Sequence, residues 1–105
     1  MTAAADPILT RFRAALDETY GERLERVVLF GSHARGDARP DSDYDIAVFL
    51  KDLDSFGIEA GRIAAIGADI LYDTGAIINA IPFRAGACRE CTGLMLELRR
   101  DGLDL

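Results

Sequence analysis

Residues 27–50 decide the fold, and they read VVLFGSHARGDARPDSDYDIAVFL. Within this stretch, Val27 to Phe30 is a continuous apolar run of the length expected for a buried strand, and it ends at the pair Gly31-Ser32. A second apolar run, Tyr44 to Leu50, follows a loop rich in turn-forming residues. The stretch therefore predicts two strands, with the Gly-Ser pair placed where the first one ends.

The Gly31-Ser32 pair has the chemistry of a phosphate-binding turn. Gly31 lacks a Cβ, so the backbone can take an unusual turn and a phosphate can approach closely. Ser32 adds a hydroxyl and a backbone N–H as donors. The next residues, His33 to Arg35, can begin a short helix whose first N–H groups also face an anion, and Arg35 would then meet phosphate oxygens in bidentate fashion. This segment predicts a site for nucleotide phosphates.

Two aspartates, Asp43 and Asp45, stand at the start of the second predicted strand. Side chains alternate between the faces of a strand, so both carboxylates project to the same side, one pleat apart. Two carboxylates so close repel one another unless a cation lies between them. Because Mg²⁺ is commonly held by one or two carboxylates together with water and substrate phosphates, the pair predicts a divalent metal site beside the phosphate-binding turn.

The spacing of these residues, Gly-Ser followed after ten residues by Asp-x-Asp, forms a signature. On this signature the chain resembles the DNA polymerase β-like nucleotidyltransferase superfamily. Within that superfamily it is most similar to the minimal nucleotidyltransferases (MNT), the antitoxins of bacterial HEPN/MNT toxin–antitoxin pairs. Arg35 matches the basic residue that often follows the Gly-Ser pair in this family. A predicted N-terminal helix and the closing residues 98–103 fit as well, so the resemblance spans nearly the full chain.

The resemblance implies an enzyme that transfers AMP from ATP to a hydroxyl with the help of Mg²⁺ or Mn²⁺. Asp43 and Asp45 would be the catalytic residues and the metal ligands, while Gly31, Ser32 and Arg35 would bind the nucleotide. The resemblance also implies a partner, a HEPN-domain toxin whose tyrosine accepts the AMP, and hence a hetero-oligomer.

One residue departs from the family pattern. Catalytic members usually carry a third acidic residue on a later strand, but the polar residue of the corresponding predicted strand here is Asn79. An amide coordinates a metal through one neutral oxygen and is no base at neutral pH. Asp73, just before that strand, is the alternative third acid, and the sequence leaves the choice between Asn79 and Asp73 open.

Two other functions stay open beside the enzyme. The chain can instead be a non-catalytic antitoxin that neutralises its partner by stoichiometric binding, which Asn79 favours and the Asp43-Asp45 pair opposes. A nucleotidyltransferase that modifies a small molecule is a third interpretation, but larger members use an added domain to hold such an acceptor. With 105 residues, half of them hydrophobic, the chain is predicted to form one domain, residues 1–105.

The charge balance bears on the predicted partners and location. Acidic residues outnumber Lys and Arg 18 to 12, for a net charge of −6. This balance argues against a nucleic-acid partner, because phosphate backbones are bound by an excess of cationic side chains. Residues 1–6 show no secretion signal and no apolar stretch is long enough to cross a bilayer, so we expect a cytoplasmic protein without membrane contact.

Apolar spacing predicts the remaining elements. It indicates helices over residues 7–20 and from residue 54 or 55 to 72, a strand over 75–83, and a last helix with Leu94 and Leu98 inward and Glu97 outward. In the second of these helices the residues expected to be buried are Phe56, Ala60, Ile63, Ile70 and Leu71. Cys88 and Cys91 are expected to be reduced helix residues. Together these elements predict an α/β domain in which helices flank a small mixed sheet, the minimal nucleotidyltransferase core that the resemblance implies.

Overall fold

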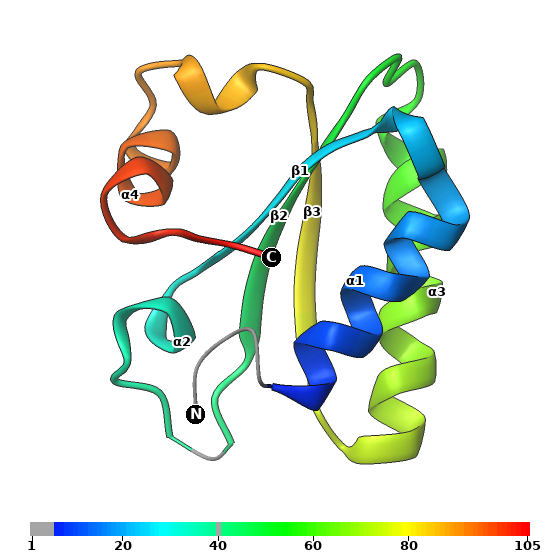
Figure 1. Ribbon diagram of the computed structural model, residues 1–105, viewed down its shortest axis with the longest axis vertical. Helices are drawn as coiled ribbons and strands as arrows, with labels where there is room; N and C mark the ends of the chain where they lie inside the picture. Colours follow the sequence, from blue (N-terminus) through cyan, green and yellow to red (C-terminus); the bar gives the residue numbers. More distant parts are fainter. Residues whose placement is uncertain (1–5, 40) are drawn as a thin grey trace.

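The chain folds into a four-stranded sheet with helices on both faces (Figure 1). The structure is a computed structural model, and it describes residues 6–39 and 41–105. Its α-helices are α1 (Pro7–Tyr20), α2 (Ser32–Arg35), α3 (Phe56–Thr74) and α4 (Gly93–Asp101), and its 3-10 helices are η2 (Gly21–Arg23) and η3 (Ala87–Arg89). Its strands are β1 (Leu24–Phe30), β2 (Tyr44–Leu50), β3 (Ile78–Arg84) and β4 (Leu103–Asp104). This arrangement confirms the predicted α/β class.

The sheet has the strand order β3-β2-β1-β4 and is mixed, as predicted. β2 runs parallel to β3, whereas β1 is antiparallel to both β2 and β4. In this register Phe30, at the end of β1, lies opposite Asp45, and Asp45 lies opposite Asn79. The end of β1 and the beginnings of β2 and β3 therefore meet at one end of the sheet.

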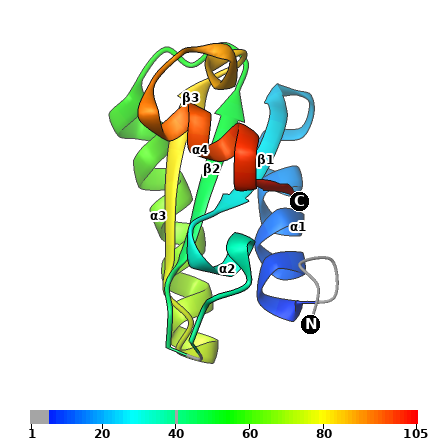
Figure 2. The same ribbon diagram turned by 90° about the vertical axis from the view of Figure 1, so that its left-hand side faces the viewer.

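Alternate residues of the strands face two separate apolar layers. α1 and α3 cover one face of the sheet, and α4 lies across the other face together with the short α2 (Figures 1 and 2). The layer under α1 and α3 includes the buried side chains of Phe12, Leu16, Val27, Leu29, Ile46, Val48, Ile63 and Ile70. The layer under α4 includes those of Val28, Ala47, Phe49, Met95 and Leu98. Because Asp45 alternates with Ala47 and Phe49, its side chain belongs to the α4 face.

The helix α1 begins and ends where the sequence predicts. The side chain of Asp6 accepts a hydrogen bond from the N–H of Ile8 at 2.9 Å, and Pro7 occupies the first turn, where its missing N–H costs nothing. The chain leaves the helix at Gly21 with a φ of +54°. These local signals set where α1 begins and ends, while its buried residues pack it against the sheet.

The buried stripe of α3 differs from the predicted one. Ile63 and Ile70 are buried as expected, but Phe56 and Leu71 are 57% and 45% exposed, while Glu59 is only 4% exposed. Successive helix residues point about 100° apart, so a stripe through Ile63 and Ile70 turns Leu71 away from the sheet. The prediction that Phe56 and Leu71 are buried was therefore wrong, because it followed side-chain type rather than one continuous stripe.

Glu59 can be buried because two arginines neutralise its carboxylate. Arg23 Nη2 lies 2.8 Å from one carboxylate oxygen and Arg62 Nη1 lies 3.3 Å from the other. The guanidinium of Arg23 also sits 5.6 Å from the centre of the Tyr20 ring. This cluster covers one end of the apolar layer under α1 and α3. It lies near the start of β1, at the opposite end of the sheet from Asp45.

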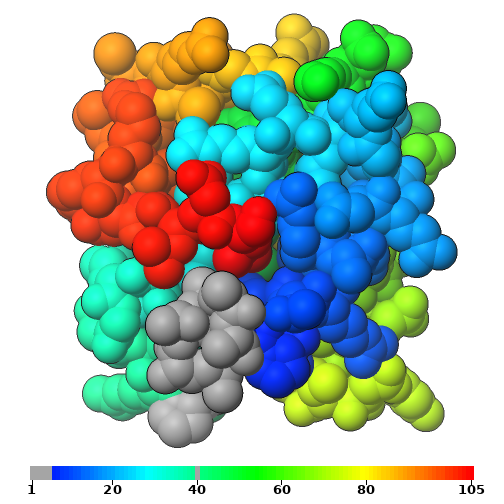
Figure 3. Space-filling view, viewed as in Figure 1, coloured from blue at the N-terminus to red at the C-terminus, as the bar shows by residue number. Residues whose placement is uncertain are grey.

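The short strand β4 adds an edge that the sequence did not predict. Residues 103–104 pair with Val28 and Leu29 of β1, and the carbonyl of Leu105 accepts a hydrogen bond from Arg13 at 2.9 Å. Figure 3 shows this last segment, in red, lying between α4 and the blue α1. A pairing two residues long has no periodicity of its own, so only the structure reveals it.

The structure also bears on the predicted membrane and cysteine properties. No helix within residues 6–39 and 41–105 is long and apolar enough to cross a membrane. The prediction of no secretion signal rests on residues 1–6, and residues 1–5 lie outside the part of the chain that the structure describes. Cys88 is buried in η3 and Cys91 is exposed just before α4, so the expectation of two helix cysteines was wrong for Cys91; both are free thiols in the described chain.

Leu98→Ala should lower the free energy of unfolding by about 2–5 kcal/mol, because removing a side chain that is 3% exposed leaves a cavity between α4 and the sheet. Leu96→Ala, on the same helix but 53% exposed, is the matched control and should change it by less than about 0.5 kcal/mol. Urea denaturation measures both values. Equal losses would mean that α4 does not pack on the sheet as described.

Candidate active site

Gly31 ends β1 in a backbone conformation that suits glycine. Its φ is +74°, and a Cβ at this position would lie 2.5 Å from the Oδ2 atom of Asp45. An ordinary side chain is therefore disfavoured twice, by backbone strain and by direct contact. The sequence predicted that the missing Cβ admits a phosphate, and the structure shows that it already admits the carboxylate of Asp45.

The predicted short helix after Gly31 is present as α2 and begins one residue earlier than expected, at Ser32. The carbonyl of Gly31 accepts hydrogen bonds from the N–H groups of Ala34 and Arg35, both at 3.1 Å, and Gly36 ends the helix with a φ of +82°. Gly31, Ser32 and Arg35, the three predicted nucleotide-binding residues, thus lie in one continuous turn.

Asp43, Asp45 and Asn79 meet on the α4 face of the sheet. The Asn79 amide donates a hydrogen bond to Oδ2 of Asp43 at 3.0 Å, and Asn79 is also the register partner of Asp45. Asp43 is exposed and Asp45 is half-buried beside Gly31. The structure therefore brings together the two predicted metal ligands, the Gly-Ser turn and the residue at the expected third position.

The surroundings of Asp45 disfavour its negative charge. Burial raises the pKa of Asp45 above its ordinary value, and a hydrogen bond from Asn79 opposes this shift. The negative charges of Asp43 and Glu97 raise the pKa further, while His33 lowers it. The net shift of the Asp45 pKa is upward, because burial and the charges of Asp43 and Glu97 outweigh the hydrogen bond from Asn79 and the effect of His33.

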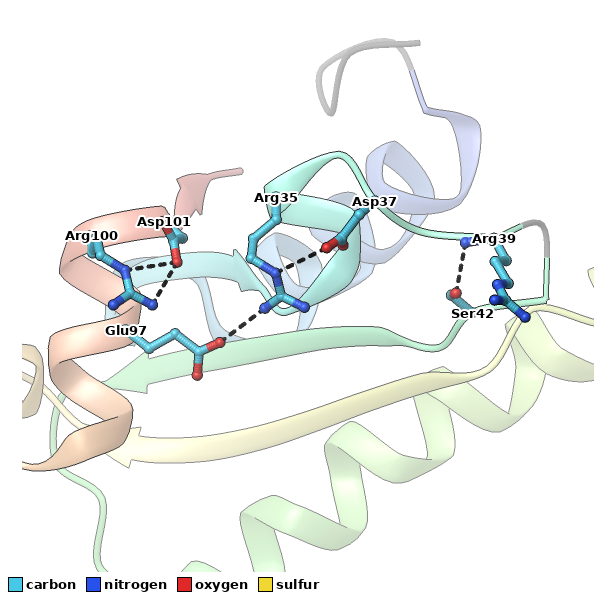
Figure 4. A network of polar contacts seen from close by, with 7 residues as sticks. All are labelled: Arg35, Asp37, Arg39, Ser42, Glu97, Arg100 and Asp101. Atoms are coloured by element: carbon cyan, nitrogen blue, oxygen red, sulfur yellow. Dashed lines mark hydrogen bonds and ion pairs between the residues drawn. The ribbon is translucent and has the colours of Figure 1, made fainter.

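Glu97 is a residue of this site that the sequence analysis missed. It lies on α4, where it was expected to face outward, yet its Oε1 atom is 3.2 Å from Nη1 of Arg35. Figure 4 shows the Arg35 guanidinium between Glu97 and Asp37, whose Oδ2 is 3.4 Å from Nε. The sequence carries no signal for this pair, because the position of α4 over α2 is set by packing between distant segments.

Asp73, the alternative third acid, lies elsewhere. Its carboxylate pairs with Nη2 of Arg11 at 2.7 Å, an ion pair between α3 and α1 in the layer on the other face of the sheet. Asn79, by contrast, touches Asp43 directly. The geometry therefore puts the amide, not the Asp73 carboxylate, beside the acidic pair.

Two aromatic rings inside the signature hold the loop in place. His33 stacks on Tyr44 with ring centres 3.9 Å apart, and its Nε2 atom is 2.9 Å from the carbonyl oxygen of Ser42. The Tyr44 hydroxyl donates to Asp6, the residue that caps α1, at 2.7 Å. Burial, together with this hydrogen bond and the charge of Asp6, raises the pKa of Tyr44 to about 12. Tyr44 thus anchors β2 to α1 from the face opposite the two aspartates.

The side chains present suit a divalent cation that takes some of its ligands from the protein and others from a nucleotide. Within the part of the chain that the structure describes, no group of three or more His, Cys, Asp or Glu side chains is arranged to hold a metal ion. Asp43 and Asp45 nevertheless offer two carboxylates with the Asn79 amide beside them. Mg²⁺ typically binds one or two carboxylates and fills its octahedron with water and substrate phosphates, so two carboxylates fit that ion.

Comparison with known proteins defines the class of protein. Residues 9–90 match the family described as "Nucleotidyltransferase domain", and the chain belongs to this family. The matched range includes the Gly-Ser turn, both aspartates and Asn79, and it ends before Glu97.

Two relatives from Methanocaldococcus jannaschii carry the name "Putative protein adenylyltransferase". One, MJ0604, is 34% identical over 73 residues, which cover 70% of this chain and 67% of the relative. The other, MJ0141, is 37% identical over 46 residues, which cover 44% of this chain and 46% of the relative. The chain thus spans about half to two thirds of the length of these curated relatives.

Solved structures share the fold at lower sequence identity. A crystal structure described as a "putative nucleotidyltransferase" from Sulfolobus solfataricus aligns with a TM-score of 0.66 and 19% identity, over 92% of this chain and 75% of the other. A crystal structure described as a toxin-antitoxin with AMP-PNP aligns with a TM-score of 0.59 and 17% identity, over 89% and 68%. These likenesses establish the fold of the chain.

Gly31→Ala should destabilise the protein more than Gly36→Ala does. Both glycines have a positive φ, but only Gly36 lies in the left-handed helical region, where alanine costs about 1–2 kcal/mol in backbone strain. Gly31, with a ψ of −155°, lies in a region that is almost confined to glycine, where the strain is about 1–3 kcal/mol. Only the Cβ added at position 31 also meets Asp45; among the described residues, nothing lies within 4 Å of one added at position 36. Chemical denaturation of the two variants measures the difference, and Asp45→Ala should recover part of it in the Gly31→Ala background. Equal losses would contradict the close approach.

The raised pKa of Asp45 predicts a loss of stability as the pH increases. The folded protein keeps this proton when the same carboxyl in the unfolded chain has lost it, so the free energy of unfolding falls as the pH rises from the ordinary pKa through the raised one. Asp45→Asn removes this contribution and should exceed the wild type in stability by a margin that grows towards neutral pH. Urea denaturation across this pH range tests it. Asp41→Asn, an exposed control, should keep the wild-type pH dependence.

Proposed function

We propose that this chain is a protein adenylyltransferase that uses ATP and a divalent metal ion, Mg²⁺ or Mn²⁺. The observation that carries the proposal is the meeting of the Gly31-Ser32 turn with the carboxylates of Asp43 and Asp45 on one face of the sheet. Membership of the nucleotidyltransferase family and the names of the relatives support the same activity.

Each residue of the site has a role that its chemistry sets. The hydroxyl and N–H of Ser32 would bind the terminal phosphates of ATP, and Arg35 would pair with them. Asp43 and Asp45 would hold the metal ion, which when bound supplies positive charge to the phosphates. Asn79 would keep the acidic pair in place through its hydrogen bond, since an amide is no base at neutral pH.

The proposed reaction is an in-line displacement at the α-phosphorus of ATP. The oxygen of the acceptor hydroxyl forms a bond to this phosphorus, and the bond from phosphorus to the oxygen that bridges to the β-phosphate breaks. Pyrophosphate leaves with the bonding electron pair, and the hydroxyl proton leaves to water. The work of the protein is to position the reactants and to balance charge.

We further propose that the acceptor is a tyrosine of a HEPN-domain toxin, so that the chain acts as an antitoxin in a hetero-oligomer. The structural neighbour described as a toxin-antitoxin with AMP-PNP supports both a toxin partner and an adenine nucleotide. The excess of 18 acidic residues over 12 Lys and Arg speaks against nucleic acid as the acceptor.

The Asn79 amide favours a second function. Catalytic members of the superfamily usually carry an acid at this position, whereas here an amide binds Asp43. In this alternative the chain neutralises its partner by stoichiometric binding, and transfer of AMP plays no part in neutralisation.

A transfer assay tests the enzyme. A mixture of the chain, Mg²⁺, ATP labelled on its α-phosphate and the proposed HEPN-domain partner should yield labelled partner. Asp43→Asn should reduce the rate by about 10²-fold or more, because the metal ion that would balance the charge of the reacting phosphates loses a carboxylate ligand. Asp41→Asn removes an equal charge two residues away and should keep the wild-type rate.

Survival of cells that express the toxin separates the two functions. If transfer neutralises the toxin, Asp43→Asn should fail to rescue growth while Asp41→Asn rescues it. Rescue by Asp43→Asn at the wild-type level, without any labelled partner, would establish the binding antitoxin instead.

A further inference from the structure

Arg35, the arginine of the Gly-Ser turn, already has two anionic partners. Its Nη1 atom lies 3.2 Å from Oε1 of Glu97, and its Nε atom lies 3.4 Å from Oδ2 of Asp37 (Figure 4). These are two of the donor positions with which a guanidinium forks onto phosphate oxygens. A nucleotide that uses Arg35 must therefore compete with carboxylates of the protein itself.

Of the two carboxylates, Glu97 is the one held by the core. Its neighbour Leu98 is 3% exposed, and with Met95 it packs in the layer that contains Val28 of β1. Directly after α4, the strand β4 pairs with β1 as well. Asp37, by contrast, follows α2 in an exposed loop and is separated from Arg35 by only one residue, Gly36. The position of Glu97 is thus set independently of the turn that it contacts.

We propose that Glu97 is a positioning residue that occupies Arg35 in the nucleotide-free protein and yields it only to the terminal phosphates of a nucleoside triphosphate. The proposal rests on the proposed function, because it takes the Gly-Ser turn as the nucleotide site. A triphosphate carries several negative charges against the single charge of Glu97, so it can take over the guanidinium, whereas AMP has no terminal phosphates to do so. The contact sets the affinity for ATP through Arg35.

The expected effect of Glu97 on nucleotide affinity is modest, because both side chains of its ion pair with Arg35 are partly exposed to solvent. The side chains of Arg35 and Glu97 are 41% and 31% exposed, and an ion pair of this kind shifts an equilibrium by up to about fivefold. Glu97→Gln should therefore tighten the binding of α,β-methylene-ATP with Mg²⁺ by about two- to fivefold at low salt, and the gain should shrink as salt is added. The affinity for AMP should stay the same.

A double-mutant cycle with calorimetric titration tests the contact. In an Arg35→Gln background, Glu97→Gln should no longer change the affinity for α,β-methylene-ATP, because the partner of Glu97 is gone. Glu97→Asp keeps the charge but shortens the side chain, so it should tighten binding in the same direction as Glu97→Gln. Asp101→Asn, which removes a charge from the same helix at a carboxylate paired with Arg100, is the control and should leave the affinity unchanged.

The outcomes separate this proposal from the proposed function. Weaker binding by Glu97→Gln, or an equal gain in both backgrounds, would overturn the role of Glu97 while leaving the nucleotide site intact. An unchanged affinity in Glu97→Gln would do the same. If the wild type and every variant bind neither α,β-methylene-ATP nor inorganic tripolyphosphate, both proposals fail.

Discussion

The carboxylate of Asp45 lies where a side chain of residue 31 would otherwise be, and the rest of the site depends on this contact. Where β1 and β2 bring Phe30 opposite Asp45, the carboxylate can lie against the turn only because the next residue, Gly31, has no Cβ to push it away. The turn and the acidic pair, which are separate in the sequence, thereby become one geometric unit. Asn79 of the neighbouring strand completes it by binding Asp43.

Side chains alternate between the two faces of the sheet, so that one face packs against the supporting helices α1 and α3 and the other carries the candidate site. Residues of one parity, such as Ile46, pack under α1 and α3, and Tyr44 of the same parity ties β2 to the cap of α1. The alternate residues, Asp43 and Asp45, lie on the α4 face, where several carboxylates are close together and the pKa of Asp45 is raised. An unfavourable arrangement of charge at one end of a well-packed sheet is common at functional sites, where the surrounding structure offsets its cost.

Local signals in the sequence predicted much of this structure, and distant packing decided the rest. The Gly-Ser turn, the shared side of Asp43 and Asp45 and the cap at Asp6 each depend on a few neighbouring residues, so pattern and chemistry were sufficient to find them. The Glu97 contact was missed because the place of α4 over the sheet depends on Leu98 and its partners in β1 and β2. The buried stripe of α3 could not be predicted correctly for the same reason, since the burial of Glu59 depends on Arg23 from a distant segment as well as on Arg62 of the same helix.

An amide at position 79 changes how the acidic end of the sheet is held together without metal. A third carboxylate at this position would add to the repulsion between Asp43 and Asp45 whenever no cation lies between them. The side-chain amide of Asn79 instead donates a hydrogen bond to Asp43 and so links β3 to it without any ion. The acidic pair therefore has a link to β3 that does not depend on a bound metal ion.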